Sequence, residues 1–257
     1  MAVRISILAS SSSGNCAFLG TETTRILIDA GLSRRETFAR LAAIGEDPAQ
    51  LTAILISHEH SDHVAGLPAL ARHLRIPIFV TERTAPLLEW GEPRPEVRTF
   101  PAGSVFAIGD IEVTSFTVPH DAVDPVAFRF EADGRALAIA TDLGYVPESI
   151  KWHLRRTDFL LLESNHDLDM LKVGPYPWSV KQRVMSRTGH LSNEVAGRFI
   201  EHDLSDQTKT LVLGHLSEQN NYPELVRLVA SQSLARRRLD TQLVVAEPRC
   251  AAGVFTL

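Results

Sequence analysis

The chain has 257 residues, of which 44% are hydrophobic and 22% charged, with a formal net charge of −5. This composition suits a globular protein with one sizeable core, and we expect a single domain over residues 1–257. The negative charge argues against a protein that coats nucleic acid by bulk charge, although it permits a local basic groove. The apolar runs are too short to cross a membrane or to form a secretory signal, so we expect a cytoplasmic protein without membrane contact.

Short strands and one capped helix are expected before the first histidine cluster. The apolar runs predict strands at residues 3–8, 17–19 and 25–28, with a polar loop of small residues over 10–15. A helix is expected from Ser33 to Ile44, because Ser33 and Glu36 have the spacing of a capping box and Gly45 follows as a stop signal.

A dense group of metal-ligating side chains follows the next predicted strand, at residues 53–56. His58, His60, Asp62 and His63 fall within six positions as that strand ends. Residues i and i+2 project to the same side of an extended chain, so His58 and His60 can share one ion. Asp62 and His63 would then turn toward a second ion, with Ser61 capping a helix through residue 74. Imidazole and carboxylate ligands of this kind suit first-row divalent metals.

The middle of the chain predicts many short strands and one more helix. Strands are expected at residues 78–80, 97–100, 105–108, 111–118, 126–131 and 135–140, with a helix at 83–90. Ala132-Asp133-Gly134 predicts a hairpin between the last two of these strands. Several apolar strands end in a polar residue. These strand-end residues are Asp29, His120, Asp142 and His215.

Basic and aromatic residues are interleaved between residues 163 and 193, a mixture typical of phosphate contact and base stacking. An amphipathic helix over 178–185 with a solvated charged face would explain the same pattern. The segment ends in Gly189-His190-Leu191-Ser192-Asn193, where Ser192 or Asn193 could cap a helix running to residue 200. A helix N-terminus with a histidine and hydroxyls can bind phosphate. Beyond residue 222 we expect a helix and a last strand at 242–246.

The run His58-Glu59-His60-Ser61-Asp62-His63 resembles the HxHxDH motif of the metallo-β-lactamase superfamily, whose further ligands also lie at strand ends. The resemblance implies an α/β (α+β) fold, a four-layer αββα sandwich, where composition alone would allow any mixed fold. Over much of its length the chain also resembles the bacterial YycJ (WalJ) family. That second resemblance is carried by SSSSGNC (10–16), LIDAGLS (27–33), ESNHDLDMLKVGPYPWSVKQRV (163–184), GHLSN (189–193) and LGHLSEQNN (213–221). It implies a 5′→3′ exonuclease that acts on double-stranded DNA.

The resemblance also implies a role for each site residue. One metal would be held by His58, His60 and His120, the other by Asp62, His63 and His215, with Asp142 bridging the two. The pair of divalent ions would be zinc or manganese, with iron also accepted by such ligands, and would supply a shared hydroxide as nucleophile. Asp62 would also orient that nucleophile, and Asp29 would bond a ligand histidine.

His190 is the predicted proton donor to the leaving group, because the Gly-His-Leu-Ser-Asn run is similar to a phosphate-binding motif of nucleic-acid-processing members of the superfamily. Ser192 and Asn193 are predicted to grip a substrate phosphate, and His166 is a second candidate for that contact. The substrate would be DNA rather than RNA, while the oligomeric state is left open.

Three other interpretations use the same residues. A hydrolase of a small ester, lactone, thioester or cyclic phosphodiester would keep the ligands but need a closed pocket. A di-iron redox protein is expected to replace a ligand histidine by a carboxylate, yet position 60 is histidine. A non-catalytic binding module would keep the fold without needing every ligand. The basic segment favours the nuclease, but no spacing distinguishes an end-binding pocket from a continuous groove.

Overall fold

The computed structural model describes residues 2–247 and 250–257, and in this part of the chain it contains two seven-stranded sheets. The first sheet has the spatial order β14 (Phe255–Thr256), β1 (Arg4–Ser11), β2 (Gly14–Gly20), β3 (Arg25–Ile28), β4 (Ala53–Leu55), β5 (Ile78–Thr81) and β6 (Val97–Phe100). The second has the order β13 (Gln242–Val245), β12 (Thr210–Gly214), β11 (Phe159–Glu163), β10 (Arg135–Ala140), β9 (Val126–Ala132), β8 (Ile111–Thr117) and β7 (Val105–Ile108).

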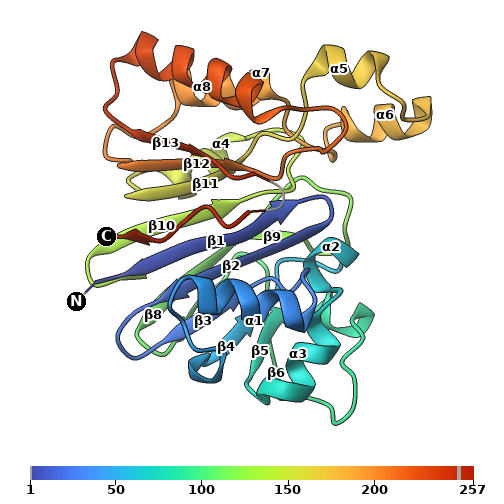
Figure 1. Cartoon of the computed structure of the whole chain (residues 1–257), viewed down its shortest axis with the longest axis vertical. Helices are drawn as coiled ribbons and strands as arrows, with labels where there is room; N and C mark the ends of the chain where they lie inside the picture. Colours follow the sequence, from blue (N-terminus) through green and yellow to red (C-terminus); the bar gives the residue numbers. More distant parts are fainter. Residues whose placement is uncertain (1, 248–249) are drawn as a thin grey trace.

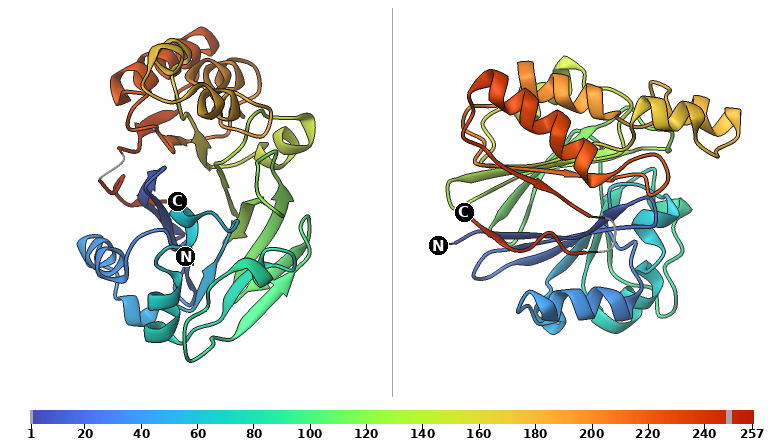
Figure 2. Two further views of the ribbon diagram at one scale, coloured as in Figure 1. Left: turned by 90° about the vertical axis from the view of Figure 1, so that its right-hand side faces the viewer. Right: turned by 45° about the horizontal axis from the view of Figure 1, so that its top comes forward.

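The two sheets pack face to face with helices on both outer faces, which confirms the four-layer αββα prediction (Figures 1 and 2). The helices are α1 (Arg34–Ala43), α2 (Ser61–Val64), α3 (Leu67–Leu74), α4 (Glu148–Leu154), α5 (Leu168–Val173), α6 (Trp178–Val184), α7 (Asn193–His202) and α8 (Pro223–Arg237). None of them, within the described residues, is both long and apolar enough to span a bilayer.

The alternation of side chains along each strand explains the layers. In β11, Phe159 and Leu161 enter the core between the sheets, whereas Leu160 and Leu162 pack under the outer helices. In β3, Ile26 and Ile28 likewise face the other sheet. Successive residues of a strand point to opposite faces, so strands buried on both faces appear in the sequence as continuous apolar runs.

The capped helix predicted at Ser33–Ile44 is confirmed as α1, since Ser33 Oγ accepts a hydrogen bond from the Glu36 amide. The predicted hairpin between β9 and β10 is also confirmed. The helix expected from a Ser61 cap to residue 74 is wrong in two respects. His60 occupies the cap position, and the helix is broken into α2 and α3. Pro68 explains the break, because its ring clashes with the carbonyl four residues earlier in a continuous helix.

The helix expected at 83–90 is also wrong, since only a 3₁₀ turn forms at Ala85–Leu87. Pro86 permits the start of a helical turn, but the chain becomes extended at Leu88, whose side chain packs in the core beneath the first sheet. The strand predicted to be the last, 242–246, corresponds to β13, and a further short strand, β14, returns to pair with β1. Helices α4 and α5 had no counterpart in the sequence analysis.

The topology brings several strand ends to one edge of the sandwich. Strands β3 to β6 are mutually parallel, as are β10 to β13. The carboxyl ends of parallel strands lie at the same edge of a sheet, so residues that follow them meet in space. Helices α2, α5 and α6 lie at one end of the molecule, and both termini lie at the other (Figure 1).

Candidate metal centre

The turn after β4 delivers its four polar side chains into two neighbouring groups. His58 and His60 meet His120, which follows β8, and Nδ1 of His60 lies 3.2 Å from Nε2 of His120. Each of these three residues places a possible ligand atom within 4.8 Å of the others. The structure thus brings together the first predicted ligand set.

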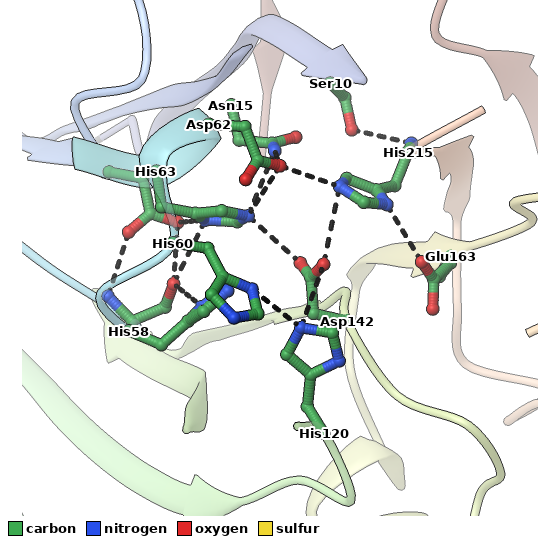
Figure 3. Close-up of polar contacts among 12 residues, drawn as sticks. Ser10, Asn15, His58, His60, Asp62, His63, His120, Asp142, Glu163 and His215 are labelled. Atoms are coloured by element: carbon green, nitrogen blue, oxygen red, sulfur yellow. Dashed lines mark hydrogen bonds and ion pairs between the residues drawn. The ribbon is translucent and has the colours of Figure 1, made fainter. Parts of the chain in front are cut away.

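The second predicted set also converges. Oδ2 of Asp62 lies 3.4 Å from Nε2 of His63 and 3.5 Å from Nε2 of His215, which follows β12 (Figure 3). Asp142, which follows β10, lies between the two sets. Its Oδ2 is 3.2 Å from His63 Nε2, and its Oδ1 is 3.4 Å from His215 Nε2 and 3.9 Å from His120 Nε2. A carboxylate in this position can contribute one oxygen to each of two ions.

Hydrogen bonds on the outer nitrogen of several rings leave the inner nitrogen free for an ion. Nδ1 of His63 donates to Oδ2 of Asp29 at 2.8 Å, and Asp29 is itself held by the amide of Ser57. Nδ1 of His120 donates to the Gly189 carbonyl at 3.3 Å. Such partners select the ring tautomer and raise the basicity of the ligand nitrogen.

The backbone is strained at the strand ends that supply the site. Asp29, Asp142 and His215 have φ values of 59°, 60° and 57°, in the left-handed region that side-chain-bearing residues seldom adopt. Such conformations cost about 1–3 kcal/mol each and persist where the surroundings hold them. Here the side chains of Asp142 and His215 turn toward each other, and that of Asp29 turns toward the outer nitrogen of His63.

Glu163, at the end of β11, is a site residue that the sequence analysis did not single out. It is fully buried, and its Oε1 accepts hydrogen bonds from Nδ1 of His190 at 2.7 Å and of His215 at 2.9 Å. Its Oε2 accepts the amides of Leu143 and Leu191. The signal was available, because Glu163 is also a polar residue directly after a buried apolar strand.

Asn15 was also missed as a site residue. It follows the serine run in β2, and its Nδ2 donates to Oδ2 of Asp62 at 3.0 Å. Its Oδ1 accepts the Ser11 amide, which closes the turn between β1 and β2. The start of β2 therefore orients Asp62 through Asn15. The loop predicted over 10–15 is wrong in its extent, because only Ser12 and Ser13 lie between the two strands.

The buried polar atoms of the site fit a divalent cation. Nε2 of His58 and Oδ2 of Asp142 are buried and form no hydrogen bond within the described residues. Burial lowers the pKa of His58 well below its usual value, which keeps it in the neutral form that binds metals. Burial acts to raise the pKa of Asp142, but the charges of His215 and His63 outweigh it and hold that pKa well below its usual value. The neutral imidazole of His58 and the ionised carboxylate of Asp142 are both donors that suit a divalent metal.

A cavity of about 310 Å³ opens beside these ligands, and His190 lines it together with His60, Asp62, Asp142 and His215. The ring of His190 is stacked on that of His215, with centroids 5.2 Å apart. Because its Nδ1 is bound to Glu163, Nε2 is the nitrogen left for a ligand in the cavity. The structure therefore places His190 beside both ligand sets.

The other residues predicted to contact phosphate are buried outside the lining of this cavity. Oγ of Ser192 caps α7 by accepting the Val195 amide, and Oδ1 of Asn193 accepts hydrogen bonds from Ser164 and Asn221. His166 lies against Asn165, and burial lowers its pKa to about 4. The phosphate role of these three residues stays a prediction, and in this arrangement their side chains bond to neighbouring protein groups.

Gly31, which follows β3, packs closely against the metal-binding turn and provides a test of that packing. A Cβ on Gly31 would lie 1.7 Å from the Asp62 carbonyl oxygen. We therefore expect Gly31→Ala to lower the free energy of unfolding by about 3 kcal/mol or more, because backbone must move to relieve the overlap. Urea unfolding measures this loss.

Gly45→Ala is the matched comparison, because Gly45 has a φ of 77° and nothing within 4 Å of its would-be Cβ. It should cost only about 1–2 kcal/mol, the price of a left-handed alanine. Equal losses in the two variants would show that Asp62 is not held by close packing on Gly31.

Comparisons with known proteins find the same kind of domain. A family model described as a beta-lactamase superfamily domain matches residues 24–215. The chain is 40% identical over 240 residues to the exodeoxyribonuclease YycJ of Bacillus anthracis, covering 92% of this chain and 91% of that relative. It is also 40% identical over 241 residues to the exodeoxyribonuclease WalJ of Streptococcus pneumoniae serotype 2 (strain D39), covering 92% and 90%.

Among solved structures, the chain resembles the metallo-beta-lactamase fold protein YhfI of Bacillus subtilis. The TM-score is 0.74 at 18% identity, with all of both chains covered, a likeness of fold. The described residues of the metal centre thus lie on a scaffold that recurs in distantly related sequences.

Proposed function

Because this chain belongs to the metallo-β-lactamase superfamily, and within it to the family of the exodeoxyribonucleases YycJ and WalJ, we propose a nuclease function for it. The proposed activity is that of a metal-dependent 5′→3′ exonuclease acting on double-stranded DNA. The observation that carries the proposal is the position of Asp142 between two ligand sets, beside a cavity that also contains His190. The DNA substrate is taken from the names of these relatives, whereas the 5′→3′ polarity and the double-stranded form are what the resemblance to the YycJ (WalJ) family implies. Both halves of the chain build the core between the sheets, so we also propose that residues 1–257 act as one domain.

Two divalent ions, zinc or manganese with iron also suited to the donors, would occupy the two ligand sets. His58, His60 and His120 would hold one, Asp62, His63 and His215 the other, and Asp142 would touch both. Bound there, the ions would acidify a water molecule and neutralise charge on a phosphodiester during in-line displacement. This donor set retains His60 and all other predicted ligands, which supports hydrolysis over di-iron redox chemistry or a metal-free binding role.

The residues around the cavity suit the remaining steps. Asp62 is fixed by Asn15, so its carboxylate can orient the attacking water. As the new bond from water to phosphorus forms and the bond from phosphorus to the departing 3′ oxygen breaks, that oxygen needs a proton. His190 would supply it from Nε2, while Glu163 on Nδ1 stabilises the protonated ring.

The shape of the site supports attack at an end of the strand. The cavity, about 310 Å³, is near the lower limit of about 300 Å³ for small-molecule pockets. Space of that order can hold a single terminal nucleotide. This agrees with stepwise removal of nucleotides from an end.

The proposal is tested with linear duplex DNA labelled at the 5′ or the 3′ end, incubated with manganese, zinc or a chelator. We expect labelled mononucleotides to appear early from the 5′ label with metal, and no release with chelator. His60→Ala should lose at least about 10²-fold in rate, because it removes one direct ligand of the first ion.

Early release from the 3′ label alone would contradict the proposed polarity. Absence of turnover on DNA and RNA with every metal, together with hydrolysis of a small phosphodiester or ester, would favour the small-molecule hydrolase instead. The same His60→Ala variant serves both assays, since either reaction would depend on the metal site.

A further inference from the structure

One wall of the metal cavity comes from helix α6, which the metal chemistry leaves without a role. Val180, Arg183 and Val184 line the cavity, and their spacing of three and four residues puts them on one face of the helix. The rest of the lining includes the predicted ligands His60, Asp62, Asp142 and His215. The cavity thus has a charged metal side and a largely apolar side that carries one guanidinium.

The Arg183 guanidinium hydrogen-bonds to Oδ2 of Asp121 at this cavity. Asp121 follows the ligand His120, and its Oδ1 lies 3.5 Å from Nε2 of His120. The ion pair therefore lies directly beside the first ligand set. Arg183 is 63% exposed and Asp121 28% exposed, and solvent-exposed pairs of this kind are held only weakly.

Among the described residues that line the cavity, Arg183 is the only arginine or lysine. The neighbouring cations of the same segment are engaged elsewhere. Nζ of Lys181 donates to the Lys172 carbonyl, and the Arg187 guanidinium lies 4.3 Å from the centroid of the Tyr145 ring. An anion that enters this cavity therefore meets Arg183 on the side facing the metal ligands.

We propose that Arg183 binds the terminal phosphate of a 5′-phosphorylated DNA end, and that Asp121 competes with this phosphate for the same guanidinium. The inference rests on the proposed nuclease function and adds the identity of the preferred end. The planar guanidinium forms paired hydrogen bonds with phosphate, and a monoester carries more charge than the single carboxylate it displaces. Val180 and Val184 then face the terminal nucleoside.

In this arrangement Asp121 pairs with Arg183 only until a phosphate replaces it. Without substrate it keeps Arg183 across the cavity, and with a phosphate it loses its partner. A terminus with a 5′-hydroxyl offers no group that replaces the carboxylate. The enzyme should therefore discriminate between the two kinds of end through KM rather than kcat, because Arg183 contacts the terminal phosphate and not the bond that breaks.

The test compares two blunt duplexes that differ only in a 5′-phosphate or 5′-hydroxyl. We expect Arg183→Gln to raise KM for the phosphorylated duplex about 10- to 100-fold, the value of a charged hydrogen bond, and to change KM for the hydroxyl duplex less than about threefold. Asp121→Asn should act in the opposite direction and lower KM for the phosphorylated duplex, because the competitor has lost its charge. Arg183→Lys should restore part of the discrimination.

Arg187→Gln is the matched control. It also removes one arginine charge, but Arg187 lies four residues after Arg183 and outside the cavity lining. It should shift KM for both duplexes equally. If Arg183→Gln also shifts both equally, or if the wild-type protein does not distinguish the two ends, the assignment of Arg183 is overturned while the nuclease function stands.

Binding of deoxyadenosine 5′-monophosphate to the manganese-loaded protein tests the phosphate contact independently of nuclease activity. If the protein degraded no DNA, the proposed function would have failed, and calorimetry would still compare wild type with Arg183→Gln. Weaker binding by the variant supports a phosphate contact at Arg183. Equal affinity rejects it.

Discussion

Asp142→Asn is expected to lower the rate of DNA hydrolysis by about 10³-fold, equivalent to about 4 kcal/mol of transition-state stabilisation. The asparagine has nearly the same shape but carries no charge, and its amide nitrogen cannot ligate a cation. Because Asp142 reaches toward His63, His215 and His120, the change affects both ligand sets. We therefore also expect the bound metal to fall from about two ions to about one per chain.

Initial rates on 5′-labelled duplex and plasma mass spectrometry of the gel-filtered protein measure these two effects. Asp169→Asn is the matched control, because Asp169 is a 91% exposed aspartate on α5 that pairs only with Lys172 in the described structure. It should retain wild-type activity and metal content. Two bound ions and activity within about tenfold of wild type in Asp142→Asn would remove Asp142 from its bridging role.

Glu163→Gln is expected to weaken metal binding about 10- to 100-fold and to lower activity further, because Glu163 orients one ligand and the proposed proton donor at once. All four of its observed hydrogen-bond partners are donors: the rings of His190 and His215 and the amides of Leu143 and Leu191. The amide group of glutamine must turn an N–H toward one of those donors. In a fully buried position that leaves polar groups unpaired.

Burial acts to raise the pKa of Glu163, but the neighbouring His190 and His215 outweigh it and lower that pKa to about 2. Glu163 is therefore an anion at neutral pH that holds both rings. Zinc affinity measured against a competing chelator separates this positioning role from a merely structural one. A variant that unfolds at lower temperature yet binds zinc as tightly as wild type would show that Glu163 serves the fold alone.

Glu131→Gln is the control for Glu163→Gln. Glu131 lies on β9, is 52% exposed and pairs with Arg129. Loss of that exposed pair should cost no more than about 1 kcal/mol of stability and leave zinc affinity unchanged. A comparable fall in zinc affinity in both variants would indicate a general effect of the lost negative charge.

Local rules explain why so much of the site could be predicted. His58, His60, Asp62 and His63 are neighbours in sequence, so their proximity needs no tertiary information. Asp29, His120, Asp142 and His215 were predicted because the resembled fold places further ligands at strand ends and each of them follows an apolar strand. Parallel strands bring their carboxyl ends together. Glu163 obeys the same rule and was overlooked because it stands within a segment dominated by basic and aromatic residues.

Other features depended on residues far apart in the chain. The predicted helix at 83–90 did not form because Leu88 is drawn into the core beneath the first sheet, a tertiary contact that outweighs helical propensity. Strand β14 is only two residues long and exists because its partner β1 presents a free edge. Neither feature has a periodic pattern of its own.

The sequence by itself determined most of the short strands and the cluster of His58, His60, Asp62 and His63, because apolar periodicity and ligand type are properties of neighbouring residues. The layered fold and the complete ligand assignment were implied by the family resemblance. Only the tertiary structure decided how those ligands are held and what faces them. The left-handed backbone at Asp142, the burial of Glu163 between two rings and the pairing of Arg183 with Asp121 join segments that are distant in sequence. Such contacts arise from packing. Packing compensates the free-energy cost of a strained backbone and creates low-dielectric surroundings, and neither effect can be predicted from a local pattern of residues.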